Sequence, residues 1–206
     1  MKKENNKVNP KAIIIIGPPA VGKYTISKML SEKCNYCLLH EHQLLDIASA
    51  LFNESPIERT TYYFKLKLDV FSDFIKYNTS NQSVITTFVH LFDRDYYKHF
   101  LISFLNMFQK NNYDVHVIEL TASYEERIKR NTNEDRLKAK PSQQNIENSV
   151  KKMKAIEEKA RTNSIESDTL FENYHHTIID TELLSENEVV SKIISLDFVT
   201  VPPETK

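Results

Sequence analysis

Residues 11–23 read KAIIIIGPPAVGK, and this stretch decides the fold. Its first part, residues 11–16, is a run of β-branched residues, a pattern typical of a strand that is buried on both faces in a parallel sheet. Residues 17–22 interrupt the run with two glycines and two prolines, and from Lys23 onward apolar residues recur at helical spacing. The stretch therefore predicts a strand, a loop and a helix in that order.

The loop matches the phosphate-binding pattern G-x-x-x-x-G-K. It also holds both glycines of the chain, where average usage of about 7% would give roughly 14. Glycine lets the backbone wrap around a phosphate, the N–H groups and the helix N-terminus face the anion, and the lysine adds a charge that reaches the β- and γ-phosphates. The alternative is a strand-to-helix turn with an incidental lysine. We predict a nucleotide triphosphate site formed by Gly17, Pro18, Pro19, Ala20, Val21, Gly22, Lys23, Tyr24 and Thr25.

The residue after the lysine departs from the pattern. This position normally holds Ser or Thr, whose hydroxyl binds Mg²⁺, but here it holds Tyr24. Thr25 follows and is rotated by about 100° around the helix, so it takes the metal-ligand role only after a local shift. We keep Thr25 as the candidate metal ligand, and a carboxylate such as Glu41 is the alternative, acting through water.

The rest of the chain alternates strands with helices, which predicts an α/β fold with three α/β/α layers around a five-stranded parallel sheet. A single domain over residues 1–206 is expected, with a lid segment around 127–142 and a frayed tail over 200–206. The predicted strands are 11–16, 36–39, 83–89, 114–120 and 176–179. The predicted helices are 23–33, 44–51, 56–77, 93–110, 124–130, 146–156 and 186–196.

Composition excludes several classes of function. The 206 residues carry a formal net charge of -1, so no overall basic field points toward nucleic acid. No apolar run approaches the roughly 20 residues that a membrane span needs, and no secretory segment precedes the first strand. We therefore expect a cytoplasmic protein with no nucleic-acid or membrane partner, either a monomer or a homodimer. Cys34 and Cys37 are interpreted as small buried hydrophobes, with a zinc site shared with His40 and His42 as the weaker alternative.

Three features together resemble the small P-loop kinases, a group that includes the shikimate, gluconate, adenylate and antibiotic-modifying kinases. They are the IIIIGPPAVGK stretch, the arginine-rich residues 125–130 after the fourth strand, and Asp180 with Thr181 after the fifth. Within the group the chain most resembles shikimate-kinase-like ATP-binding proteins, whose second strand likewise ends in a His-x-His such as residues 40–42. This resemblance implies ATP-dependent phosphoryl transfer without naming the acceptor. It also implies that Asp180 and Thr181 form the turn that contacts adenine.

The arginines support phosphoryl transfer independently. Arg127, Arg130 and Arg136 lie within ten residues, and positive charge over the γ-phosphate stabilises the charge that spreads in the transition state. The alternative is a solvated basic helix end, which the helix dipole favours. We assign these three arginines and Lys23 as catalytic candidates.

The acceptor is expected across the carboxyl edge of the sheet from the phosphate loop. Glu41 or Asp93 would orient or deprotonate an acceptor hydroxyl, as an acidic group does in the kinases that the chain resembles, and Glu41 is the catalytic candidate. The alternative for Asp93 is a helix N-cap. The full set of candidates at this edge is His40, Glu41, His42, Thr86, Thr87, His90, Asp93 and Arg94.

The sequence thus predicts a kinase that uses ATP and Mg²⁺ to phosphorylate a small-molecule acceptor. One alternative is a nucleotide-binding sensor or regulatory protein without catalysis, which Tyr24 favours. A second alternative is a slow NTP hydrolase. GTP selectivity is not expected, because residues 131–135 do not fit the Asn-Lys-x-Asp motif.

Overall fold

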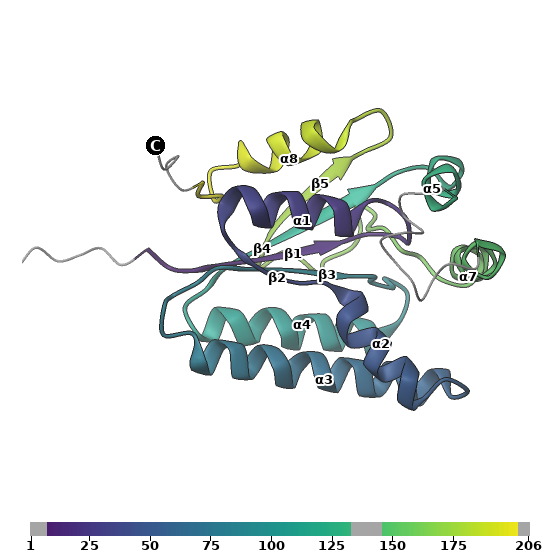
Figure 1. Cartoon of the computed structure of the whole chain (residues 1–206), viewed down its shortest axis with the longest axis horizontal. Coiled ribbons are helices and arrows are strands. Elements are labelled where there is room, and N and C mark those ends of the chain that lie inside the picture. The colour runs from purple at the N-terminus through teal and green to yellow at the C-terminus, as the bar shows by residue number, and fades with distance from the viewer. Residues whose placement is uncertain (1–7, 133–145, 202–206) are drawn as a thin grey trace, which may run out of the picture.

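The protein, described by a computed structural model over residues 8–132 and 146–201, is built on five parallel strands in the order β2-β3-β1-β4-β5 (Figure 1). This sheet and its helices confirm the predicted α/β class. The central strand β1 has four isoleucines, Ile13–Ile16, that are fully buried, which is why it lies in the middle of the sheet. The strands are β1 Lys11–Ile16, β2 Cys37–Leu39, β3 Val84–Phe88, β4 Asp114–Thr121 and β5 His175–Asp180.

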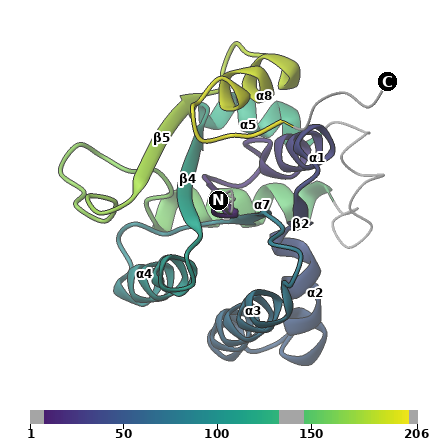
Figure 2. The same cartoon turned by 90° about the vertical axis from the view of Figure 1, so that its left-hand side faces the viewer.

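Helices cover both faces of the sheet, as the three-layer prediction requires. Helices α1 and α8 lie on one face, and α3 and α4 lie on the other (Figures 1 and 2). Helices α5 and α7 lie beyond the carboxyl ends of the strands (Figure 1). The bounds are α1 Lys23–Cys34, α2 Glu41–Leu51, α3 Pro56–Tyr77, α4 Asp95–Lys110, α5 Tyr124–Asn131, α7 Ile146–Lys159 and α8 Glu186–Ile194.

Each face of the sheet has its own core, because successive residues of a strand point to opposite faces. Ile13 and Ile15 pack with α1 and α8, while Ile14 and Ile16 pack with the aromatic side chains of α3 and α4. The aromatic core includes Phe64, which stacks on Phe100 with ring centroids 4.0 Å apart. Phe64 and its neighbour Tyr63 therefore belong to the core of this face.

A few boundaries differ from the prediction. Helix α4 begins at Asp95 with Arg94 as its N-cap, so the interpretation of Asp93 as an N-cap is wrong. The reason is a turn before the helix, in which the Arg94 backbone N–H donates to the Leu91 carbonyl at 3.2 Å. Most of the predicted lid and the end of the tail fall in residues 133–145 and 202–206, outside the described residues. Within the described ranges no helix is both long and apolar enough to cross a membrane.

Candidate active site

The loop between β1 and α1 holds the backbone conformations that the phosphate-binding pattern requires. Gly17 has a φ of 140° and Gly22 a φ of 103°, and Ala20 is also left-handed at 64°. A Cβ at Gly17 would lie 2.4 Å from the carbonyl oxygen of Leu120, so the loop passes directly over the end of β4. Gly22 is the N-cap of α1 and has no side chain to cap the first turn. The N–H groups of that turn are therefore not capped by the N-cap side chain and can meet an anion.

Lys23 is the first residue of α1, and its side chain folds back over the loop. The Nζ atom donates hydrogen bonds to the carbonyl oxygens of Gly17 at 2.8 Å and Pro18 at 2.9 Å, and the residue is buried. The ammonium group thus lies on the loop that the sequence assigned to phosphate binding. Its contact with phosphate remains a prediction.

The two residues after Lys23 point in different directions. The Tyr24 ring meets the ring of His40 edge-on, with centroids 4.7 Å apart, while Thr25 is exposed on α1. The contact between Tyr24 and His40 brings the start of α1 next to the end of β2, where Glu41 follows. Mg²⁺ is usually held by one or two protein oxygens together with substrate phosphates and water. The Thr25 hydroxyl and the Glu41 carboxylate fit that donor set, and both assignments stay predictions.

Helix α5 brings two of the predicted arginines to the loop. Arg127 is buried, and its guanidinium donates to Pro19 O at 3.4 Å and to the Glu157 carboxylate of α7 at 2.8 Å. Arg130 donates to Val21 O at 3.4 Å and is held by the Glu126 carboxylate at 3.0 Å. Both guanidinium groups therefore contact backbone carbonyls of the phosphate loop. Arg136, the third predicted arginine, lies outside the described residues.

The turn after β5 is joined to the same helix. Arg130 donates to the hydroxyl of Thr181 at 2.9 Å and to its carbonyl oxygen at 2.7 Å. Thr181 is buried and donates to Thr121 O, while Asp180 is exposed and accepts from the Glu182 backbone N–H. Thr181 thus connects β4, β5 and α5 at the edge of the loop. The adenine contact that the resemblance implied for both residues stays a prediction.

At the edge where the acceptor is predicted, the structure brings Glu41 against the end of β3. The Glu41 backbone N–H donates to the Thr87 hydroxyl at 2.8 Å, and its carboxylate accepts from the Val89 N–H at 3.2 Å. His90 follows and is fully buried, and neither of its ring nitrogens has a hydrogen-bond partner among the described residues. Burial lowers the pKa of His90 to about 4, so the ring is neutral at physiological pH.

The other candidates at this edge are not gathered into one cluster. Asp93 and Arg94 are exposed, and the rings of His40 and His42 are half-buried with centroids 6.2 Å apart. Among the described residues no group of three or more His, Cys, Asp or Glu side chains could hold a metal ion. Cys34 is buried and Cys37 half-buried, and burial raises the pKa of both thiols, which fits their interpretation as small hydrophobes.

Two buried charged residues, Glu119 and Lys67, were not predicted from the sequence. Glu119 of β4 is fully buried and accepts hydrogen bonds from Asn163, from the Ser164 backbone and hydroxyl, and contacts His176 Nε2 at 2.9 Å. Burial alone would raise the pKa of Glu119, but the hydrogen bonds from His176, Ser164 and Asn163 hold it below its usual value. The missed signal was an acidic residue in the buried middle of a strand.

The second missed residue is Lys67 of α3, which is 1% exposed. Its Nζ donates to the Thr86 hydroxyl at 2.8 Å and to Thr87 O at 3.0 Å. Lys67 lies four residues after Tyr63 and four before Phe71, so a lysine on the apolar stripe of the helix was the available signal. Burial lowers the pKa of Lys67 to about 7, against an opposing effect of the Glu41 carboxylate.

This shift predicts a pH dependence of stability. Between pH 7 and pH 9 the unfolded chain binds a proton on Lys67 that the folded protein has largely lost, so the free energy of unfolding rises with pH. A folded pKa of about 7 against an unfolded value of 10.5 gives a gain on the order of 2 kcal/mol over this range. Urea unfolding of the native chain and of Lys67→Met at both pH values measures the difference. An equal pH response of the two proteins would contradict the shift.

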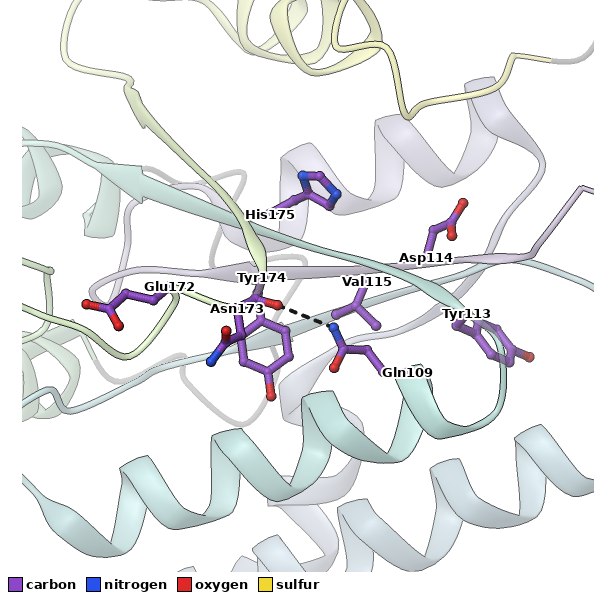
Figure 3. Close-up of a pocket in the computed structure, with 8 residues that line it drawn as sticks. All are labelled: Gln109, Tyr113, Asp114, Val115, Glu172, Asn173, Tyr174 and His175. Carbon is purple, nitrogen blue, oxygen red and sulfur yellow. Dashed lines mark hydrogen bonds between the residues drawn. The ribbon is translucent and has the colours of Figure 1, made fainter.

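A hollow of about 470 Å³ lies at the opposite edge of the sheet, near the starts of β4 and β5 (Figure 3). Polar side chains line much of it, and Gln109 of α4 donates to the carbonyl oxygen of Asn173 across it at 3.5 Å. Because the phosphate loop follows the carboxyl end of β1, this hollow is separate from the candidate site. Its lining residues are Gln109, Tyr113, Asp114, Val115, Glu172, Asn173, Tyr174 and His175.

Comparison with known proteins identifies the fold. A scan against family models and a search of curated proteins found no match. Among solved structures, the chain is similar to a sugar kinase from Janibacter sp. HTCC2649 at 11% identity and a TM-score of 0.59, covering 93% of this chain and 96% of that one.

It is also similar to the tunicamycin resistance protein of Deinococcus radiodurans, at 17% identity and a TM-score of 0.53, with 95% and 100% covered. A third similar structure is the shikimate kinase of Acinetobacter baumannii in complex with shikimate, at 17% identity and a TM-score of 0.51, with 92% and 93% covered. The resemblance to small P-loop kinases of the shikimate-kinase-like type is thus confirmed at the level of the fold.

Proposed function

We propose that this protein is a kinase that binds ATP on the loop of residues 17–25 and transfers the γ-phosphoryl group to a hydroxyl of a small molecule. The observation that carries the proposal is that three cationic side chains meet at one loop. Lys23, Arg127 and Arg130 all donate hydrogen bonds to its backbone carbonyls. In a phosphoryl transfer site, such charges stabilise the transition state more than they stabilise bound ATP.

The residues divide the work as follows. The loop backbone and the N-terminus of α1 bind the phosphates, and Lys23 adds a charge close to the transferred group. Arg127, Arg130 and Arg136 supply further positive charge over the γ-phosphate. Bound Mg²⁺, held by Thr25 or through water by Glu41, would neutralise phosphate charge and align the transferred group. Asp180 and Thr181 contact the adenine side of the nucleotide.

Glu41 acts on the acceptor. Its carboxylate is fixed by the Val89 N–H at the carboxyl end of β3, across β1 from the neighbouring strand β4 and the arginine helix. In this position it accepts the hydrogen bond of an acceptor hydroxyl and orients that oxygen for attack on the γ-phosphorus. The similar structures include a sugar kinase and a shikimate kinase, which favours a hydroxylated metabolite as the acceptor. We propose cytoplasmic action as a monomer or homodimer, without nucleic-acid or membrane partners.

A second candidate function is a nucleotide sensor without catalysis, or a slow NTP hydrolase. Tyr24 supports the sensor, because a phenol that contacts His40 replaces the hydroxyl that usually binds Mg²⁺. The kinase and the sensor differ in how their affinity for ATP responds to Mg²⁺. The sensor binds ATP equally with and without the metal, whereas the kinase does not.

Calorimetric titration of ATP into the native chain, with and without Mg²⁺, tests the proposal. We expect Mg²⁺ to strengthen ATP binding about tenfold or more, because the metal neutralises phosphate charge and adds protein contacts. A screen of hydroxylated acceptors then follows, with ADP release as the readout. Binding that ignores Mg²⁺, together with no acceptor raising ADP release above background, would favour the sensor. The absence of nucleotide binding would refute both functions.

A further inference from the structure

Lys67 occupies a position that costs free energy. Its ammonium group lies 5.4 to 6.0 Å from the ring centres of four aromatic residues in the core between α3, α4 and β3. Within the described part of the chain no ion pair involves Lys67, and burying an amine without a paired charge is unfavourable. An apolar side chain of similar length would fill the same space at a lower cost. Packing alone therefore does not explain the lysine. The four rings belong to Tyr63, Phe71, Phe88 and Phe104.

The hydrogen bonds of Lys67 lie where the edge strand β2 stops pairing with β3. Strand β2 pairs with β3 only as far as Leu39 opposite Thr86, so β3 continues past this point with β1 on one side alone. Lys67 donates to the Thr86 hydroxyl and to Thr87 O from the helix side. Glu41 donates its N–H to the Thr87 hydroxyl and accepts from the Val89 N–H with its carboxylate. Lys67 and Glu41 thus both contact the end of β3, and Thr87 is the residue that they share.

We propose that Lys67 is a positioning residue for phosphoryl transfer: it fixes Thr86 and Thr87, and through Thr87 it fixes Glu41 against the acceptor. This inference rests on the proposed function, because it needs Glu41 to act on the acceptor. Lys67 contacts neither the acceptor nor the nucleotide.

A double-mutant cycle tests the proposal. The variants are Lys67→Met, Glu41→Gln and the two combined, and the readouts are Mg·ATP turnover, with water as acceptor if the screen finds no other, and the dissociation constant of ATP. We expect Lys67→Met to lower kcat about tenfold, as loss of a supporting residue does, and to leave ATP binding within about twofold. In the Glu41→Gln background the same change has no further effect, because Lys67 acts through Glu41.

Controls separate this role from a purely structural one. Lys65→Met changes an exposed lysine of the same helix, which pairs with Asp69, and should leave kcat unchanged. Thr87→Val removes the acceptor of the Glu41 N–H while Lys67 remains, and should reproduce the loss of kcat, which covers the case that Lys67→Met does not fold. The proposal would be overturned if the losses of kcat in Lys67→Met and Glu41→Gln multiply in the double variant. It would also be overturned if kcat is unchanged in Lys67→Met.

Failure of the proposed function gives a different result. If the native chain binds ATP but never turns it over, the kinase proposal is wrong and hydrogen exchange decides the role of Lys67. The amides of Glu41 and Val89 should then exchange about tenfold faster in Lys67→Met, while the amides of β1 keep their protection. Equal exchange rates at Glu41 and Val89 in the native chain and in Lys67→Met would refute the positioning role, whatever the outcome for the kinase proposal.

Discussion

Replacing Lys23 by methionine is expected to weaken ATP binding at least 100-fold. The substitution keeps the length of the side chain but removes the charge that we propose meets the phosphates, and hydrogen bonds to charged groups are the strong ones in such sites. It also leaves the carbonyls of Gly17 and Pro18 without the donor that they have now. Isothermal titration with Mg·ATP measures the loss.

The matched control is Lys28→Met on the same helix. Lys28 is exposed, whereas Lys23 is buried on the loop. The control therefore removes a charge of the same sign from the same helix, away from the loop. We expect its ATP affinity to stay within about twofold, since exposed charges are largely screened. Equal losses in the two variants would mean that only overall charge matters and that the loop is no phosphate cradle.

Replacing Gly17 by alanine is expected to lower the free energy of unfolding by about 3 kcal/mol and to abolish ATP binding. The new Cβ would lie 2.4 Å from the backbone oxygen of Leu120, a contact that no side-chain rotation relieves. The φ of 140° adds strain, and a clash and a strained φ each cost roughly 1–3 kcal/mol. Urea unfolding gives the stability, and the same titration gives the affinity.

Gly22→Ala separates the two causes. Gly22 also has a positive φ, of 103°, but the nearest atom to its added Cβ is a side-chain carbon of Ile26 at 4.0 Å. This variant carries the conformational strain without the clash, so we expect a loss of about 1–2 kcal/mol. If Gly17→Ala proves no less stable than Gly22→Ala, the close passage of the loop over β4 is wrong.

Most of the fold could be predicted because its signals are local. The isoleucines of β1, the helical spacing in α3 and the single glycine-rich loop each lie within a short stretch, and each appears where the sequence placed it. The ends of β2 and α4 were less certain. They depend on Ser83 O, which accepts from the Cys37 N–H, and on the turn at Arg94, and neither interaction is visible in a short window.

The site was predictable only in part, for the same reason. The loop and Lys23 are adjacent in sequence, so their pattern identifies them together. Lys67 and Glu41 are joined through Thr87, and the contacts behind the role proposed for Lys67 appear only when β3 is placed beside α3. Glu119 likewise acquires its partners from residues 163–176, which follow a long helix.

The central position of β1 has a consequence for biosynthesis. Lys11 and Asp114, which form an ion pair at the start of β1 and β4, are separated by 103 residues. At synthesis rates of roughly 5–20 residues per second, the isoleucine strand waits about 5–20 s on the ribosome before β4 emerges to pair with it. Four consecutive isoleucines form the kind of segment that aggregates when exposed, so β1, which leaves the ribosome before both of its partner strands, needs protection while the nascent chain grows.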